Sequence, residues 1–129
     1  IRQNNQKQKE EMKMEASWLN ELPVGITVCD TKGIILSMND RAALIFKKSG
    51  GRELIGKNLL ECHPREARQK VLDLYEKKQP NAYTVEKNGI KSLLYQAAWY
   101  ENGQFMGFVE FILTLPEQMS HLNSINWVK

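Results

Sequence analysis

The sequence AYTVEKNGIKSLLYQAAWYENGQFMGFVEFILTL, residues 82–115, decides the fold of this chain. It contains three segments in which apolar and polar residues alternate with the period of a β-strand, at 82–86, 91–100 and 104–115. Asn88-Gly89 and Asn102-Gly103 separate them. Asn-Gly favours a two-residue hairpin turn, because both residues tolerate a positive φ. The stretch is therefore predicted to form a three-stranded antiparallel meander.

Two further strands are predicted upstream of this meander. Residues 24–30 and 34–38 are rich in β-branched and other apolar side chains, and Thr31-Lys32-Gly33 between them has the composition of a tight turn. Asn39 follows, and its side-chain oxygen can cap a helix that extends to Phe46. These segments predict an opening hairpin followed by a short helix.

A longer helix is predicted between the hairpin and the meander. Pro64 can occupy its first position, where the missing N–H costs nothing. Its apolar stripe consists of Ala67, Val71, Leu74 and Tyr75. The order of elements predicts an α+β domain, in which helices pack on one face of a five-stranded antiparallel sheet.

The ends of the chain differ in composition from this core. Residues 1–20 contain no Gly or Pro and place Met12, Ala16 and Leu19 at helical spacing. They are predicted to form a flanking or connector helix, with a frayed terminus as the alternative. The core domain is predicted at 21–116 and a polar linker at 117–129. The charged opening without Met leads us to expect a piece of a longer protein.

Composition and charge narrow the function classes. The 129 residues carry a formal net charge of +3, but their basic and acidic residues alternate, and no basic cluster is interleaved with aromatics. A nucleic-acid groove is therefore not expected. No apolar run approaches the ~20 residues that span a bilayer. The sequence shows no signal-peptide pattern, and its two cysteines, Cys29 and Cys62, do not have a Cys-x-x-Cys spacing. A reducing, cytoplasmic location is therefore expected.

Several short motifs, in their order and spacing, resemble those of PAS domains. They are Leu22-Pro23-Val24-Gly25-Ile26, Asp30-Thr31-Lys32-Gly33, Asn39 with Ala42 and Phe46, Gly56-Lys57, and Gly107. The resemblance covers about 18–115. It implies a sensory or interaction module within a larger signalling protein that also carries an output domain. It also implies a small-molecule pocket between the long helix and the sheet, and a homodimer formed through the amino-terminal helix.

One departure from the family concerns signal output. Many PAS domains end their last strand with an Asp-Ile-Thr-like triplet that couples the core to an output helix. Thr114-Leu115-Pro116 stands at that place here. The resemblance therefore leaves the direction of signal transfer open.

The stretch from Gly56 to Tyr75 concentrates most of the potential chemistry, since it contains Cys62 and His63. His63 can ligate haem iron, which gives a haem-based gas or redox sensor as the alternative function. In the family's oxygen sensors, however, the proximal histidine lies near the position of Val71. Flavin photochemistry is not expected, because Leu59 occupies the place of the reactive cysteine after Gly56-Lys57-Asn58. The cofactor therefore stays unknown.

The remaining pocket candidates lie on the long helix and the meander. Val71 and Tyr75 belong to the helix, and Tyr95 and Trp99 share one face of a strand, where they line a pocket, a dimer surface or the core. Glu110 interrupts an apolar strand. If its side chain faces the core, it could orient a polar group of a ligand. In the alternative, it faces outward together with Met106 and Phe108, as strand alternation allows. No catalytic motif or metal-ligand spacing is present, so an enzyme is not expected, and a small enzyme with an open pocket is the second alternative.

Overall fold

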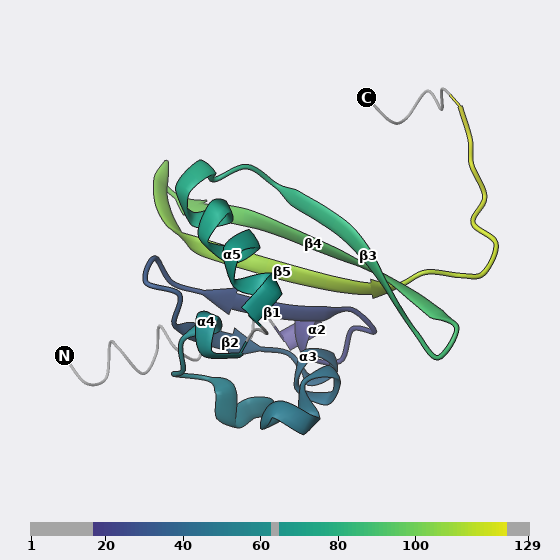
Figure 1. Ribbon diagram of the computed structural model, residues 1–129, viewed down its shortest axis with the longest axis horizontal. Coiled ribbons are helices and arrows are strands. Elements are labelled where there is room, and N and C mark those ends of the chain that lie inside the picture. The colour runs from purple at the N-terminus through teal and green to yellow at the C-terminus, as the bar shows by residue number, and fades with distance from the viewer. Residues whose placement is uncertain (1–16, 63–64, 124–129) are drawn as a thin grey trace.

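The computed structural model describes residues 17–62 and 65–123, and its elements follow the predicted order (Figure 1). The helices are α2 (Ser17–Asn20), α3 (Asp40–Ile45), the 3-10 helices η1 (Lys47–Ser49) and η2 (Gly51–Leu54), α4 (Leu59–Cys62) and α5 (Arg65–Lys77). The strands are β1 (Gly25–Cys29), β2 (Ile35–Met38), β3 (Asn81–Lys87), β4 (Ile90–Glu101) and β5 (Gln104–Thr114).

The five strands form one antiparallel sheet in the order β2-β1-β5-β4-β3. β5 lies at its centre and pairs with β1 on one side and β4 on the other. Asn88, Gly89, Asn102 and Gly103 all have φ between 50° and 79°. Both Asn-Gly turns therefore adopt the backbone that was predicted for the meander.

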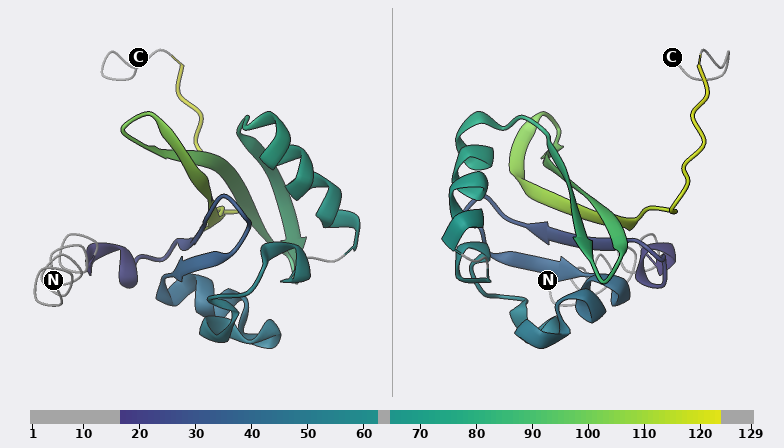
Figure 2. Two further views of the ribbon diagram at one scale, coloured as in Figure 1. Left: turned by 90° about the vertical axis from the view of Figure 1, so that its left-hand side faces the viewer. Right: turned by 45° about the vertical axis from the view of Figure 1, so that its right-hand side comes forward.

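The helices cover one face of the sheet, called the inner face below. Figure 2 shows α5 and the short helices α3 to α4 on this side. Cys29, Ile35, Met38, Ala42 and Leu54 form one buried cluster under α3 and η2, and Val71 and Leu74 bury the predicted stripe of α5. The predicted α+β class and the placement of the helices on one face are confirmed.

Asn39 ties the amino-terminal elements together. Its side-chain oxygen accepts hydrogen bonds from the backbone of Ala42 at 3.0 Å, as the predicted helix cap, and of Ile26 at 2.9 Å. Its side-chain nitrogen donates to the carbonyls of Val24 at 2.7 Å and Leu19 at 2.9 Å. Only 5% of Asn39 is exposed. One buried amide thus fixes the relative positions of α2, β1 and α3.

Two predicted features fall at the ends of the described chain. Of the helix predicted at 1–20, residues 1–16 lie outside the described residues, and Ser17–Asn20 are helical. The described part of the linker, 117–123, contains no helix or strand. In the part of the chain that the structure describes, no helix is long and apolar enough to cross a bilayer.

Candidate functional site

A cavity of about 500 Å³ opens between α3, α5 and the inner face of the sheet, and we call it the main cavity. Its lining comes from every element that meets there, and consists of Pro23, Arg41, Ile45, Phe46, Ala67, Tyr83, Val85, Lys87, Ser92, Leu94, Glu110, Ile112 and Thr114. Most of the wall is apolar, with a small number of polar groups. This combination is typical of small-molecule sites.

A row of polar residues crosses the inner face beside this cavity. The strand register places Asn81 opposite Gln96, Gln96 opposite Glu110, and Glu110 opposite Thr27. The Asn81 side-chain nitrogen donates to the Gln96 side-chain oxygen at 3.0 Å, and the Gln96 nitrogen donates to the Glu110 carboxylate at 2.6 Å. Gln96 is 4% exposed. A buried amide therefore positions the carboxylate that lines the cavity.

Thr27 ends this polar row on β1. It is also 4% exposed, and its hydroxyl oxygen has no hydrogen-bond partner among the described residues. Most buried hydroxyls in native proteins have a partner, because leaving one unpaired costs free energy. The row thus has unused hydrogen-bonding capacity next to Glu110.

Tyr83 is the polar aromatic residue of the cavity wall. Burial, followed by the nearby Glu110 carboxylate, raises the pKa of the Tyr83 hydroxyl above its ordinary value. The Lys70 ammonium lies 4.4 Å from the centre of the Tyr83 ring, in a cation–π arrangement. Tyr83 therefore keeps its proton and can donate a hydrogen bond into the cavity.

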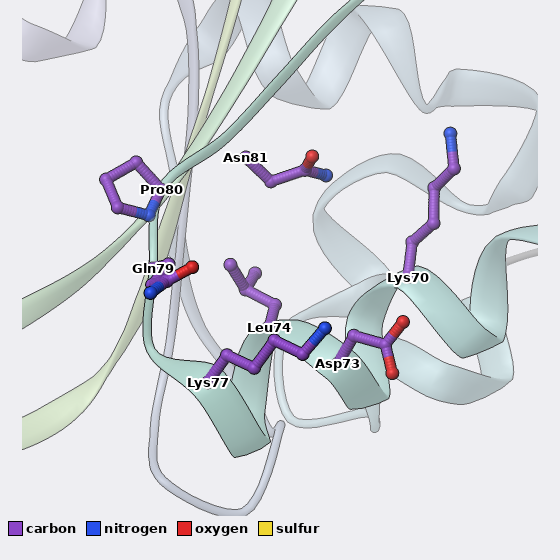
Figure 3. A pocket seen from close by; sticks show the side chains of 7 residues that line it. All are labelled: Lys70, Asp73, Leu74, Lys77, Gln79, Pro80 and Asn81. Carbon is purple, nitrogen blue, oxygen red and sulfur yellow. The ribbon is translucent and has the colours of Figure 1, made fainter.

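A smaller pocket of about 250 Å³, lined in part by Asn81, lies between the end of α5 and the start of β3. Figure 3 shows Asn81 projecting from β3 toward Lys70 of α5, with Leu74 between the helix and the strand. Asn81 thus contributes both to this pocket and to the polar row.

Val71 and Tyr75, two of the predicted site residues, lie on α5 but do not line the main cavity. Val71 is 2% exposed and packs in the core. The Tyr75 hydroxyl donates to the Asp30 carbonyl at 2.9 Å, and its ring contacts Phe108 edge to face at 4.4 Å. Burial, followed by Cys29 and Asp30, raises the pKa of Tyr75. Both residues line a separate pocket of about 200 Å³ near the β1–β2 turn.

Tyr95 and Trp99 share one face of β4, as predicted, but it is the outer face. They alternate with Gln96, whose side chain lies in the inner polar row. Tyr95 is 38% exposed and lies opposite Phe111. The Trp99 indole donates to the Cys29 carbonyl at 3.0 Å. Neither Tyr95 nor Trp99 lines the main cavity.

Glu110 lies on the inner face, and the alternative in which it points outward together with Met106 and Phe108 is wrong. Phe108 is 2% exposed and contacts Tyr75 of α5, so the face that it shares with Glu110 is the one covered by helices. The β4–β5 register shifts between Trp99 and Tyr100, which pair with Gly107 and Phe105. Met106 is therefore left without a partner residue on β4, and it does not follow the alternation of Phe108 and Glu110.

Gln96, Asn81 and Tyr83 are site residues that the sequence analysis missed. A signal was present, because Gln96 is a lone polar residue in the apolar run from Leu93 to Trp99, and Asn81 lies opposite it when counted outward from the Asn88-Gly89 turn. A polar residue inside an apolar strand indicates a buried hydrogen bond.

His63 lies outside the described residues, so its position relative to the main cavity is not described. His, Cys, Met and Tyr are the side chains that usually hold haem iron. Of these four types, the described lining of the main cavity contains only Tyr, at Tyr83. Tyr83 is protonated and already packed against Lys70. Within residues 17–62 and 65–123, no group of three or more His, Cys, Asp or Glu residues is arranged to bind a metal ion.

Comparison with known families identifies the class of protein to which this geometry belongs. The PAS fold family model matches residues 14–88, and the chain therefore belongs to the PAS family. A sensory box sensor histidine kinase from Vibrio cholerae is among the solved structures that share the fold; it is 16% identical, with a TM-score of 0.56 over 88% of this chain and 98% of that chain. No curated protein matches the chain closely enough to count as a relative.

Solved structures from several bacteria share the fold. A C-terminal domain from Streptococcus mutans is 24% identical, with a TM-score of 0.64 over 80% of this chain and 84% of that chain. The PAS domain of Bordetella pertussis BvgS is 18% identical, with a TM-score of 0.64 over 84% and 89%. The Vibrio cholerae Aer2 receptor, a dual PAS-heme oxygen sensor, is 17% identical, with a TM-score of 0.56 over 72% and 95%. At these identities, the similarity establishes the fold.

Proposed function

We propose that this PAS domain is a regulatory sensor module, without catalytic activity of its own, that binds a small molecule in the main cavity. The observation that carries the proposal is the cavity itself. Its volume of about 500 Å³ falls within the range of about 300–1,000 Å³ that holds drug-sized ligands. Its apolar walls supply affinity, and its few polar groups supply orientation.

Ligand binding would act on the helices through contacts on α3. Arg41 and Ile45 of this helix line the cavity, and the cap residue Asn39 binds the Leu19 carbonyl of α2. A ligand shifts a conformational equilibrium only if it binds the two states with different affinity. A ligand that contacts α3 and the sheet together meets this condition when α3 moves. The signal would then leave through the amino-terminal segment toward an output domain of the full-length protein.

We also propose that the module works as a homodimer in the cytoplasm and that residues 1–20 form the dimer contact. The support comes from the described end of this segment, where Trp18 is 66% exposed. An exposed tryptophan favours a binding surface, because its large ring gains much by burial. Sedimentation of the full chain and of a chain that begins at Ser17 tests this proposal. Two monomeric forms would contradict it.

Mass spectrometry under native and denaturing conditions tests ligand binding directly. We expect the purified protein to retain a small molecule in the native spectrum and to release it on denaturation. Ala67→Trp fills the main cavity and should abolish retention. Ala82→Trp makes the same substitution at an exposed position on β3 and should leave retention unchanged.

Three results would decide against this proposal. Retention by Ala67→Trp would place the molecule outside the main cavity. If the protein retains no molecule and also binds none from a fragment library, the domain would be an interaction module that binds no small molecule. A Soret band that His63→Ala removes would favour the haem sensor instead.

A further inference from the structure

We propose that Glu110 is the recognition residue of the main cavity and that it selects ligands carrying an N–H donor, such as an amine or a protonated nitrogen heterocycle, on an apolar body. This inference rests on the proposed function, because it assigns the ligand class of the same cavity. It is carried by the hydrogen-bonded row that crosses β3, β4 and β5.

The hydrogen bonds of this row run in one direction. A carboxylate only accepts, so Gln96 must turn its side-chain nitrogen toward Glu110. The Gln96 oxygen then faces Asn81, which must donate. Because Gln96 is 4% exposed, water cannot easily replace either bond. The row therefore holds the carboxylate in one orientation before any ligand arrives.

Glu110 keeps acceptor capacity for a ligand. A carboxylate has about four acceptor positions, and Gln96 occupies one of them. Among the described residues, Glu110 forms no salt bridge. A partly buried carboxylate without a cationic partner is costly, and a ligand that brings N–H groups removes that cost. A ligand group that pairs with Glu110 is therefore a hydrogen-bond donor or a cation.

The other charged groups of the cavity are consistent with a ligand whose nitrogen faces Glu110. Arg41 and Lys87 also line the cavity, but both are exposed, whereas Glu110 is partly buried. The fixed charge is therefore negative at the partly buried Glu110 and positive at the exposed Arg41 and Lys87. An amine would enter with its nitrogen toward Glu110, and a second, acidic group on the ligand would face Arg41 or Lys87. The Thr27 hydroxyl, opposite Glu110 on β1, is buried and does not line the cavity.

Three probes with the same apolar body and different head groups test the proposal. They are 2-phenylethylamine, 2-phenylethanol and 3-phenylpropionate, and calorimetry measures their affinities for the full chain. We expect the amine to bind tightest and the carboxylate weakest. Glu110→Gln keeps the shape of the side chain and removes its charge, so it should weaken amine binding about 10-fold or more and change alcohol binding by less than about 2-fold.

The outcomes separate this inference from the proposed function. Equal affinities for the three probes, or an amine preference that survives in Glu110→Gln, would overturn the role of Glu110 and leave the cavity as a ligand site. Binding by none of them in the wild type would overturn the role of Glu110, and the mass-spectrometric test would then decide separately whether the cavity is a ligand site. If Glu110→Gln fails to fold, the order of the three affinities in the wild type still decides the question. Tyr95→Phe changes a residue on the outer face of the sheet that does not line the main cavity, and serves as the control that should preserve the amine preference.

Discussion

The Gln96 side-chain nitrogen donates to the Glu110 carboxylate over 2.6 Å, and the two residues lie directly opposite each other on β4 and β5. This bond joins the fold to the site, because Gln96 is buried in the sheet while Glu110 lines the main cavity. Its contribution to stability follows from the cost of leaving either group unpaired.

A double-mutant cycle measures that contribution. We expect Gln96→Leu and Glu110→Leu each to lower the free energy of unfolding by about 1–3 kcal/mol, because each leaves a buried or partly buried partner unsatisfied. The double variant should lose clearly less than the sum, since both polar groups are gone. Urea denaturation of the four proteins gives the coupling. Losses that add to within about 0.5 kcal/mol would show that the bond has no specific energy.

A second prediction concerns Asn39, which makes four hydrogen bonds: one each to α2, β1 and α3, and one to Val24 just before β1. Asn39→Ala should lower the free energy of unfolding by about 2–4 kcal/mol, because it removes a helix cap and leaves buried backbone groups without partners. Asn39→Asp keeps the two accepted bonds and loses the two donated to Leu19 and Val24.

Hydrogen exchange distinguishes these two variants. In Asn39→Asp, we expect the amides around α2 to exchange faster while those of α3 stay protected. Equal protection of both helices would contradict the proposed connection between α2 and the cavity wall.

Gly107 allows a third prediction about the sheet. Its φ is 139°, and a Cβ placed on it would lie 2.0 Å from the Cys29 carbonyl oxygen, which belongs to the backbone of β1. Gly107→Ala combines backbone strain with this clash, and should cost more than about 3 kcal/mol or prevent folding. Gly103 has a φ of 79° but open space around it, so Gly103→Ala should cost about 1–2 kcal/mol. Thermal unfolding checks both. Equal effects would mean that the close approach of β5 and β1 is not rigid.

The pH dependence of stability gives a fourth prediction. Burial raises the pKa of Tyr75 above its ordinary value of 10.0, so the folded protein disfavours the tyrosinate. The stability that depends on this proton is fully present below pH 10 and is lost as the pH rises through the higher folded-state value. We expect the free energy of unfolding to fall above about pH 10, and Tyr75→Phe to reduce that slope. A slope identical in the wild type and in Tyr75→Phe would refute the assignment to Tyr75.

Much of this fold could be predicted from local signals in the sequence. The Asn-Gly turns, the cap at Asn39 and the apolar stripe containing Val71 each rest on residues close together in the chain, and the structure has all of them. The short helices between Lys47 and Cys62 were less apparent, because each spans only three or four residues.

The candidate site was harder to predict, because it depends on register between strands. Counted outward from the Asn102-Gly103 turn, an unbroken register places Gln96 opposite Val109. The shift between Trp99 and Tyr100 moves the pairing by one residue and places Gln96 opposite Glu110. A one-residue change in register exchanges the two faces of a strand. No signal in the sequence marked this irregularity, and the inward orientation of Glu110 could therefore not be derived from alternation alone.

Nuclear magnetic resonance of the Gln96 side-chain amide, during titration with 2-phenylethylamine, tests ligand recognition by Glu110 most directly. We expect the Gln96 amide signals and those of Ala67 to shift and saturate together. The Tyr95 signals on the outer face should stay in place, and Glu110→Gln should weaken the effect. Saturable binding that leaves the Gln96 signals unmoved, or that shifts Tyr95 instead, would contradict the claim that this PAS domain recognises its ligand through Glu110.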